Sequence, residues 1–174
     1  SIISTTPKRR ENRFYLKGNF GYLASSDKNY KNLYGTGAIF PTFKAGIKVI
    51  RNLYIWIGYG AFSNQATIPE SDENAEASQK FLFFGLNYSQ SFNKNLAFKC
   101  EAAIASIKYK ERAFGVEVED VTKGVSIEGG MIYNVSKTVF FEVSLGFMNA
   151  MDTVNTEKVK LGGLSAGLGI GFGF

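Results

Sequence analysis

Six charged residues stand out because each lies within a run of alternating apolar residues. They are three lysines and three glutamates: Lys17, Lys44, Lys99, Glu101, Glu128 and Glu142. In an extended chain each of them falls on the face that carries mostly Gly, Ala, Ser and Asn, because successive side chains point to opposite sides. Charges withdrawn from water need partners, since an unpaired one costs on the order of several kcal/mol. The matched numbers of lysines and glutamates therefore predict a charge network that neutralises itself.

The same charges could instead line a narrow conduit for ions or small solutes and set its selectivity. Glu128 and Glu142 could also act as the carboxylate pair of a glycosidase, but an interior packed with side chains would admit no sugar. The chain has no histidine, which is the commonest general base near neutral pH, and Cys100 is its only cysteine. We expect no catalytic, cofactor-binding or metal-binding residue.

Eight alternating segments of about ten residues would hold these charges in place. The last is the most regular, with Leu164, Ala166, Leu168, Ile170, Phe172 and Phe174 on one face and Gly or Ser on the other. Bare glycines weaken a strand that faces water but suit the narrow lumen of a barrel whose apolar face meets lipid. The predicted strands are 13–23, 38–49, 53–62, 80–90, 96–108, 124–134, 138–148 and 158–174.

The connections between these strands alternate in length. Short turns are expected at 51–52, 92–95 and 136–137, and long polar loops at 24–37, 63–79, 109–123 and 149–157. An even number of strands, short turns on the periplasmic side and long loops outside is typical of outer-membrane barrels. The second long loop contains Glu70, Asp72, Glu73 and Glu76, without the ligand spacing of a calcium loop, so a solvated loop is expected.

A soluble barrel of the lipocalin kind would show the same alternation with its faces exchanged. Each strand contributes about four large apolar residues to one face, and such a set would overfill the lumen of an eight-stranded barrel. The other face carries small residues and a few charges, which would fit inside. The sequence therefore predicts an all-β fold, an eight-stranded antiparallel up-and-down transmembrane β-barrel.

The N-terminal residues form a separate segment by charge. The 174 residues carry a net charge of +5. Four of the basic residues lie close together near the start of the chain: Lys8, Arg9, Arg10 and Arg13. We expect 1–12 to be a basic periplasmic tail and 13–174 to be the barrel, in a mature chain whose export signal has been removed. The basic residues form a tail rather than a face interleaved with aromatics, so nucleic-acid binding is not expected.

The pattern of strands and loops and the terminal aromatic residue resemble the small eight-stranded outer-membrane barrels of the OmpA, OmpX and opacity type. The resemblance covers residues from about Arg13 to Phe174. It implies a location in the bacterial outer membrane, lipid and the outer-membrane assembly machinery as partners, and a C-terminal assembly signal at Leu168, Ile170, Phe172 and Phe174.

The expected function is structural or surface-interacting, through external loops on a barrel with a packed interior. Three alternatives remain open at this point: a narrow channel, an accessory subunit of a larger envelope complex that uses the N-terminal tail as a contact, and a soluble lipocalin-like barrel.

Overall fold

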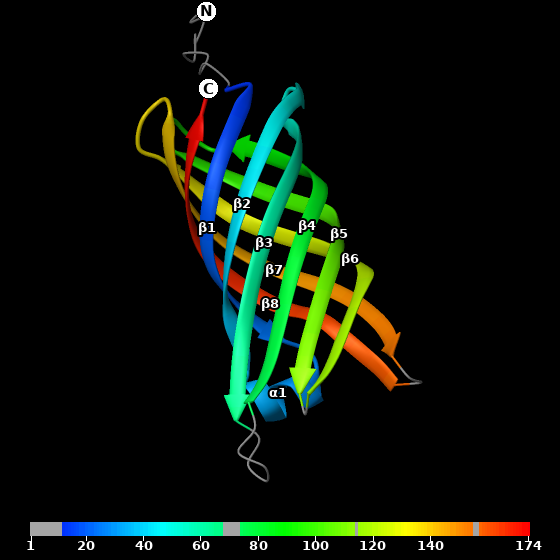
Figure 1. The fold of residues 1–174 in the computed structure, drawn as a ribbon. Helices are drawn as coiled ribbons and strands as arrows, with labels where there is room; N and C mark the ends of the chain where they lie inside the picture. Colours follow the sequence, from blue (N-terminus) through cyan, green and yellow to red (C-terminus); the bar gives the residue numbers. More distant parts are fainter. Residues whose placement is uncertain (1–11, 68–73, 114, 155–156) are drawn as a thin grey trace, which may run out of the picture.

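The protein is a closed antiparallel β-barrel in which each strand pairs with its neighbours in sequence and β8 closes on β1 (Figure 1). The computed structural model describes residues 12–67, 74–113, 115–154 and 157–174. The predicted transmembrane barrel fold is confirmed. Its strands are β1 (Phe14–Ser25), β2 (Gly37–Ile50), β3 (Leu53–Thr67), β4 (Asn74–Ser91), β5 (Leu96–Ala113), β6 (Val116–Asn134), β7 (Val139–Val154) and β8 (Glu157–Gly173).

Several strands are longer than the sequence predicts. The segments 63–79, 109–123 and 149–157 were expected to be loops, but most of their described residues belong to strands β3 to β8. The ladders continue because cross-strand pairing does not require apolar side chains, and polar pairs such as Glu76 with Arg112 and Arg112 with Glu117 remain in register. The three short turns lie where they were predicted.

A short helix, α1 (Lys28–Tyr34), occupies the first long connection, where only a loop was expected. Asp27 caps its N-terminus by accepting a hydrogen bond from the Tyr30 backbone N–H at 2.9 Å. The other Asp27 carboxylate oxygen accepts from the Lys160 backbone N–H at 3.1 Å, which ties the helix to β8. Figure 1 shows α1 across the end of the barrel opposite the chain termini. Within the described residues, no helix is long and apolar enough to cross a membrane.

The two faces of the sheet are oriented as the alternation predicts. Phe141, Leu145, Leu168 and Ile170 point outward with exposed fractions of 50%, 69%, 65% and 45%, whereas Glu142 points inward and is 3% exposed. Large apolar side chains form a belt on the outside of the barrel. Exposure of this belt to water is unfavourable, so the barrel requires a lipid environment. The soluble lipocalin-like alternative is therefore wrong.

Candidate functional site

The six charged residues predicted to form a network lie together in the barrel interior. Four of them lie directly opposite a like charge in the sheet: Lys17 on β1 is opposite Lys44 on β2, and Glu101 on β5 is opposite Glu128 on β6. Like charges opposite each other in a sheet are destabilising. These groups must therefore find their partners across the lumen.

Closure of the barrel supplies those partners. The Lys17 ammonium lies 2.6 Å from Glu101 and 2.9 Å from Glu142, and the Lys44 ammonium lies 2.5 Å from Glu101 and 3.0 Å from Glu128. Lys99 contacts all three glutamates: Glu101 at 3.1 Å, Glu142 at 2.6 Å, and Glu128. Lys99 and Glu101, two residues apart on β5, are thus the centres of the network.

The network is buried and tightly packed. Lys99 is 0% exposed and Glu101 is 1% exposed. Glycines on neighbouring strands make room for the long side chains, and a Cβ at Gly130 would lie 2.5 Å from the Val143 carbonyl oxygen and 3.0 Å from the Lys99 side chain. The Lys44 ammonium also lies 4.6 Å from the ring centre of Trp56, a cation–π contact. These six side chains therefore fill one layer of the lumen.

A second layer, the aromatic cluster, closes the lumen between the charge network and α1. Phe40 and Phe81 have ring centres 4.9 Å apart, Phe81 stacks on Phe83 at 5.9 Å, and Trp56 contacts Phe83 at 6.1 Å. Phe81 is 0% exposed. We define the cluster as Phe40, Trp56, Phe62, Phe81 and Phe83. The sequence analysis did not predict this layer, although alternation places all five residues on the inward-facing side of their strands.

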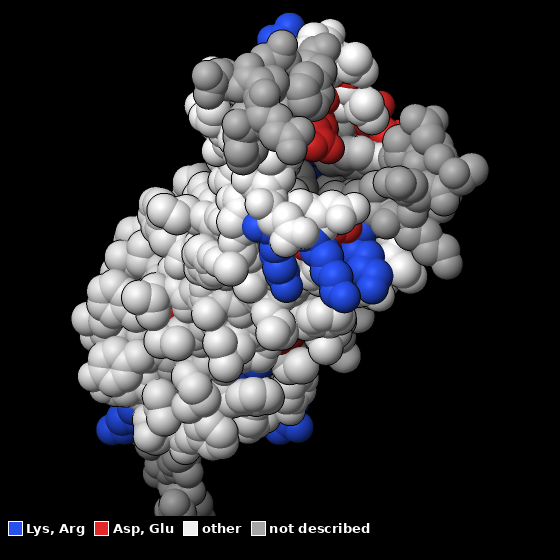
Figure 2. Space-filling view, turned by 90° about the horizontal axis from the view of Figure 1, so that it is seen from below, with Lys and Arg blue, Asp and Glu red and all other residues white. Residues whose placement is uncertain are grey.

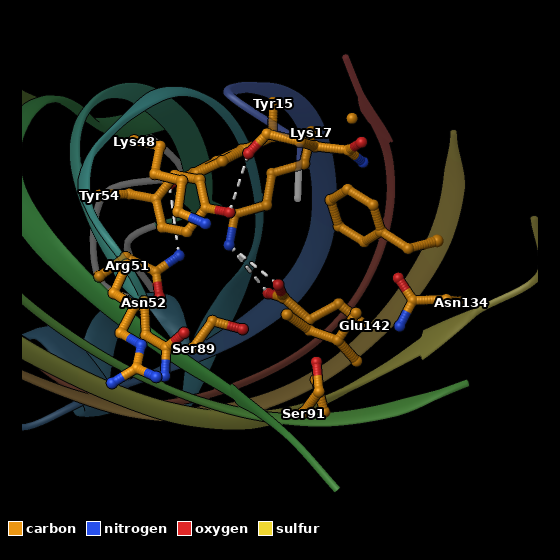
Figure 3. Close-up of a pocket in the computed structure, with 16 residues that line it drawn as sticks. Tyr15, Lys17, Lys48, Arg51, Asn52, Tyr54, Ser89, Ser91, Asn134 and Glu142 are labelled. Carbon is orange, nitrogen blue, oxygen red and sulfur yellow. Dashed lines mark hydrogen bonds and ion pairs between the residues drawn. The ribbon is translucent and has the colours of Figure 1, made fainter. Parts of the chain in front are cut away.

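Two small spaces lie on either side of the network. The one toward the short turns is about 120 Å³, and its lining includes Tyr15, Lys17, Arg51, Tyr54 and Glu142. Figure 3 shows Lys17 and Glu142 pointing toward each other at its inner end. The other space is about 60 Å³ and lies between the network and the aromatic cluster. Neither approaches the roughly 300–1,000 Å³ of a small-molecule site.

The end of the barrel near α1 is polar and exposed. Lys108 pairs with Glu119 at 2.5 Å and Lys110 pairs with Glu117 at 2.9 Å across the extended β5–β6 hairpin. The hydrogen bond from Lys108 holds the pKa of the Glu119 carboxyl below its usual value. Tyr34 of α1 donates a hydrogen bond to Glu111 at 3.0 Å, and partial burial together with the Glu111 charge raises the pKa of the Tyr34 hydroxyl.

No protein-family model matches the sequence, and no curated protein matches it significantly. Solved structures do match. Neisserial surface protein A (NspA) superposes with a TM-score of 0.70 at 12% identity, over 92% of this chain and 97% of that one. OprG of Pseudomonas aeruginosa has a TM-score of 0.71 at 12% identity, over 94% and 96%. Ail, the attachment invasion locus protein of Yersinia pestis, has a TM-score of 0.56 at 12% identity, over 94% and 99%.

The chain has the fold of the small outer-membrane β-barrels. In an outer-membrane barrel the short turns face the periplasm and the longer connections face outward, so the α1 end is the extracellular end. The space in Figure 3 is then a periplasmic vestibule, and the aromatic cluster closes the extracellular half of the lumen.

The remaining predicted residues are placed as follows. Phe172 and Phe174 are exposed on the outer surface at the periplasmic end of β8, with Leu168 and Ile170 above them. Their role as an assembly signal stays a prediction. Cys100 faces outward. The residues of the tail before Asn12, and Glu70, Asp72 and Glu73, lie outside the described residues. In the described part of the chain, no group of three His, Cys, Asp or Glu side chains could hold a metal ion.

Proposed function

We propose that the protein is a non-conducting outer-membrane barrel that acts as a rigid scaffold for recognition at the cell surface through its extracellular end. The observation that carries this proposal is the double closure of the lumen. The charge network fills one layer, with Lys99 at 0% exposure, and the aromatic cluster fills the next, with Phe81 at 0% exposure.

The channel alternative would need a continuous polar path between the two ends. The aromatic cluster offers an ion no polar group other than the Trp56 indole N–H, so an ion crossing it would lose its hydration with little compensation. The network is also satisfied within itself, because every one of its lysines contacts at least two of its glutamates. Charges engaged in this way are poorly suited to bind and release ions in transit.

A catalytic role is disfavoured by the same packing. Glu128 and Glu142 both contact Lys99, so neither is free to serve as an acid or base toward a substrate. The adjoining space of about 60 Å³ holds no sugar. The chain also has no histidine to act as a base near neutral pH.

The extracellular end has the features of a recognition surface. The β4, β5 and β6 strands continue beyond the apolar belt and present exposed charged side chains, and α1 lies beside them. Recognition residues commonly lie on loops and rims that a rigid scaffold holds in place. One of the similar structures is of an attachment invasion protein, which is compatible with such a role on this fold.

Planar-bilayer recording of the purified full chain tests the proposal. We expect no steady conductance from the wild-type protein or from Phe81→Leu, because the charge network remains intact in that variant. Removing both layers, with Phe81→Ala and Lys99→Ala combined, should produce leak currents. Steady wild-type conductance whose ion selectivity changes on neutralising Lys99 or Glu128 would contradict the proposal and favour the channel.

A further inference from the structure

The strand β6 begins well before its pairing with β7 does. Pairing of β6 with β7 reaches only to Gly124, which lies opposite Ala150, whereas pairing of β6 with β5 extends to Val116 at the extracellular end. In the part of the chain that the structure describes, the segment 116–123 therefore has a neighbouring strand on one side only. Figure 1 shows the β5–β6 and β7–β8 hairpins diverging at this end. We call the unpaired side of 116–123 the β6 edge.

The backbone groups that face the β6 edge follow from one hydrogen bond. The Val121 backbone N–H donates to the side chain of its own neighbour, Asp120, at 2.7 Å, so it takes no part in the ladder with β5. Backbone groups alternate between the two sides of an antiparallel strand, which places those of Glu117 and Glu119 on the same side as those of Val121. An edge with unpaired N–H and C=O groups is a template for pairing with another chain.

The β6 edge is also acidic. Glu117, Glu119 and Asp120 follow one another within a short stretch, and Figure 2, which looks onto the extracellular end, shows acidic and basic side chains next to each other there. Lys110 and Lys108 engage the two glutamates from the β5 side, at 2.9 Å and 2.5 Å. A strand added to β6 would lie about 5 Å from β6 and about 10 Å from β5, which is beyond the screening length of about 8 Å. The added strand would therefore meet an excess of negative charge.

The same strand of a second copy is a poor partner for the β6 edge. Antiparallel pairing centred on Glu119 would place the two copies of this residue opposite each other, and pairing centred on Val118 would place Glu117 opposite Glu119. Like charges directly opposite each other in a sheet are destabilising. The complementary strand instead carries Lys or Arg opposite these carboxylates and apolar residues beside Val116 and Val118, which are exposed.

We propose that the β6 edge binds an extended basic segment of a partner protein by strand addition. In this mode of recognition, backbone hydrogen bonds supply the affinity and alternate side chains supply the specificity. The carboxylates select the basic partner and exclude apolar or acidic strands, as charges on sheet edges commonly do. The inference rests on the proposed recognition at the extracellular end and names its partner class. A conducting lumen would contradict the proposed function and leave strand addition unaffected, so the two can fail separately.

Fluorescence anisotropy of a labelled peptide, titrated with the full chain in micelles of a zwitterionic detergent, tests the proposal. The probe is a short peptide of alternating lysine and valine. Methylation of its alternate backbone nitrogens removes backbone donors and keeps the charge, whereas replacement of its lysines with glutamate reverses the charge. Each lost backbone hydrogen bond weakens binding roughly two- to tenfold, so we expect the methylated peptide to bind at least about tenfold more weakly. The glutamate peptide should show no measurable binding.

Val121→Pro blocks the β6 edge without changing its charge. Because the Val121 backbone N–H faces the edge, proline there removes no hydrogen bond to β5, and its ring obstructs an approaching strand. Val121→Thr is the matched control, since it keeps both the backbone N–H and the branched side chain. We expect the proline variant to bind the lysine–valine probe at least about tenfold more weakly and the threonine control to bind it as the wild type does.

A second pair of variants tests the charge. Glu119→Gln combined with Asp120→Asn should weaken binding of the probe by at least about threefold, because exposed ion pairs each contribute a small amount. Glu76→Gln combined with Glu111→Gln is the control, since these acids lie on β4 and β5 and not on the β6 edge. Heat-modifiable migration on a denaturing gel verifies that each variant is folded. Equal binding by the folded proline and threonine variants, or by the methylated and unmethylated peptides, would overturn the proposal.

Discussion

At the scale of single residues, Glu101 and Lys99 determine the energetics of the interior. Glu101 contacts all three lysines of the network, whereas Glu128 contacts Lys44 and Lys99. The Glu101 side chain is 1% exposed and that of Glu128 is 20% exposed. Breaking a buried ion pair by removing one partner leaves an uncompensated charge, and the penalty rises with burial. The two glutamates are therefore unequal in their contribution to stability.

Glu101→Gln should lower the free energy of unfolding by about 3–5 kcal/mol, because it leaves three buried lysines facing two glutamates. Glu128→Gln should cost less, since solvent reaches its carboxylate. Urea unfolding in lipid vesicles, followed by fluorescence, measures both. Trp56 is the only tryptophan and lies against Lys44, so its emission reports on this layer directly. Equal losses for the two variants would show that Glu101 is not the centre of the network.

At the scale of strands, large inward aromatic side chains lie over glycines on neighbouring strands. Tyr15 of β1 covers Gly46 of β2, Phe40 of β2 covers Gly60 of β3, and Phe140 of β7 covers Gly171 of β8. A strand glycine has no side chain to pack, and the neighbouring ring covers its backbone. The inward glycines are thus part of the packing that closes the lumen, and not gaps in it.

Gly60→Ala should destabilise the barrel by about 1–3 kcal/mol, which is typical of overpacking. The added Cβ would lie 2.7 Å from the Phe40 ring and 2.8 Å from the Thr42 methyl group, and Phe40 is held by the aromatic cluster. Gly129→Ala is the matched control, because its nearest contact would be the Lys99 carbonyl oxygen at 4.0 Å. It should be neutral or slightly stabilising. Unfolding midpoints that fall equally in both variants would argue against packing as the cause.

At the scale of the whole molecule, the barrel has two chemically different ends joined by an apolar belt. The periplasmic end has short turns and the vestibule of Figure 3, whereas the extracellular end has extended strands and α1. A surface-recognition role requires partners at the extracellular end. An accessory subunit that uses its periplasmic tail would instead have partners near the short turns.

Site-specific photo-crosslinking in intact cells separates these two roles. Val116 and Val135 form a matched pair, because they are 62% and 55% exposed and lie at the extracellular and periplasmic ends, respectively. We expect a photoreactive residue at position 116 to form adducts with molecules supplied from outside the cell, and the same residue at position 135 to form none. Adducts at position 135 with a periplasmic protein, and none at position 116, would support the accessory-subunit alternative.

The sequence by itself determined which side chains face lipid and which face the lumen. Side-chain direction alternates along any extended strand, so Phe141 and Glu142 are separated by a local rule that needs no tertiary information. The short turns were predicted because they are the few residues between two alternating segments. The strand ends predicted around 63–79, 109–123 and 149–157 were wrong, because an exposed polar strand and a polar loop have similar composition. The helix α1 was also missed.

Only the tertiary structure decided which charges meet and what closes the lumen. Lys17 lies beside Lys44 in the sheet, and its partner Glu101 is 84 residues away in sequence. The two are brought within 2.6 Å because the eighth strand pairs with the first and curls the sheet into a cylinder. The aromatic cluster depends on the same closure. Its rings come from β2, β3 and β4 and pack inside the lumen, which exists only when the sheet is closed into a barrel.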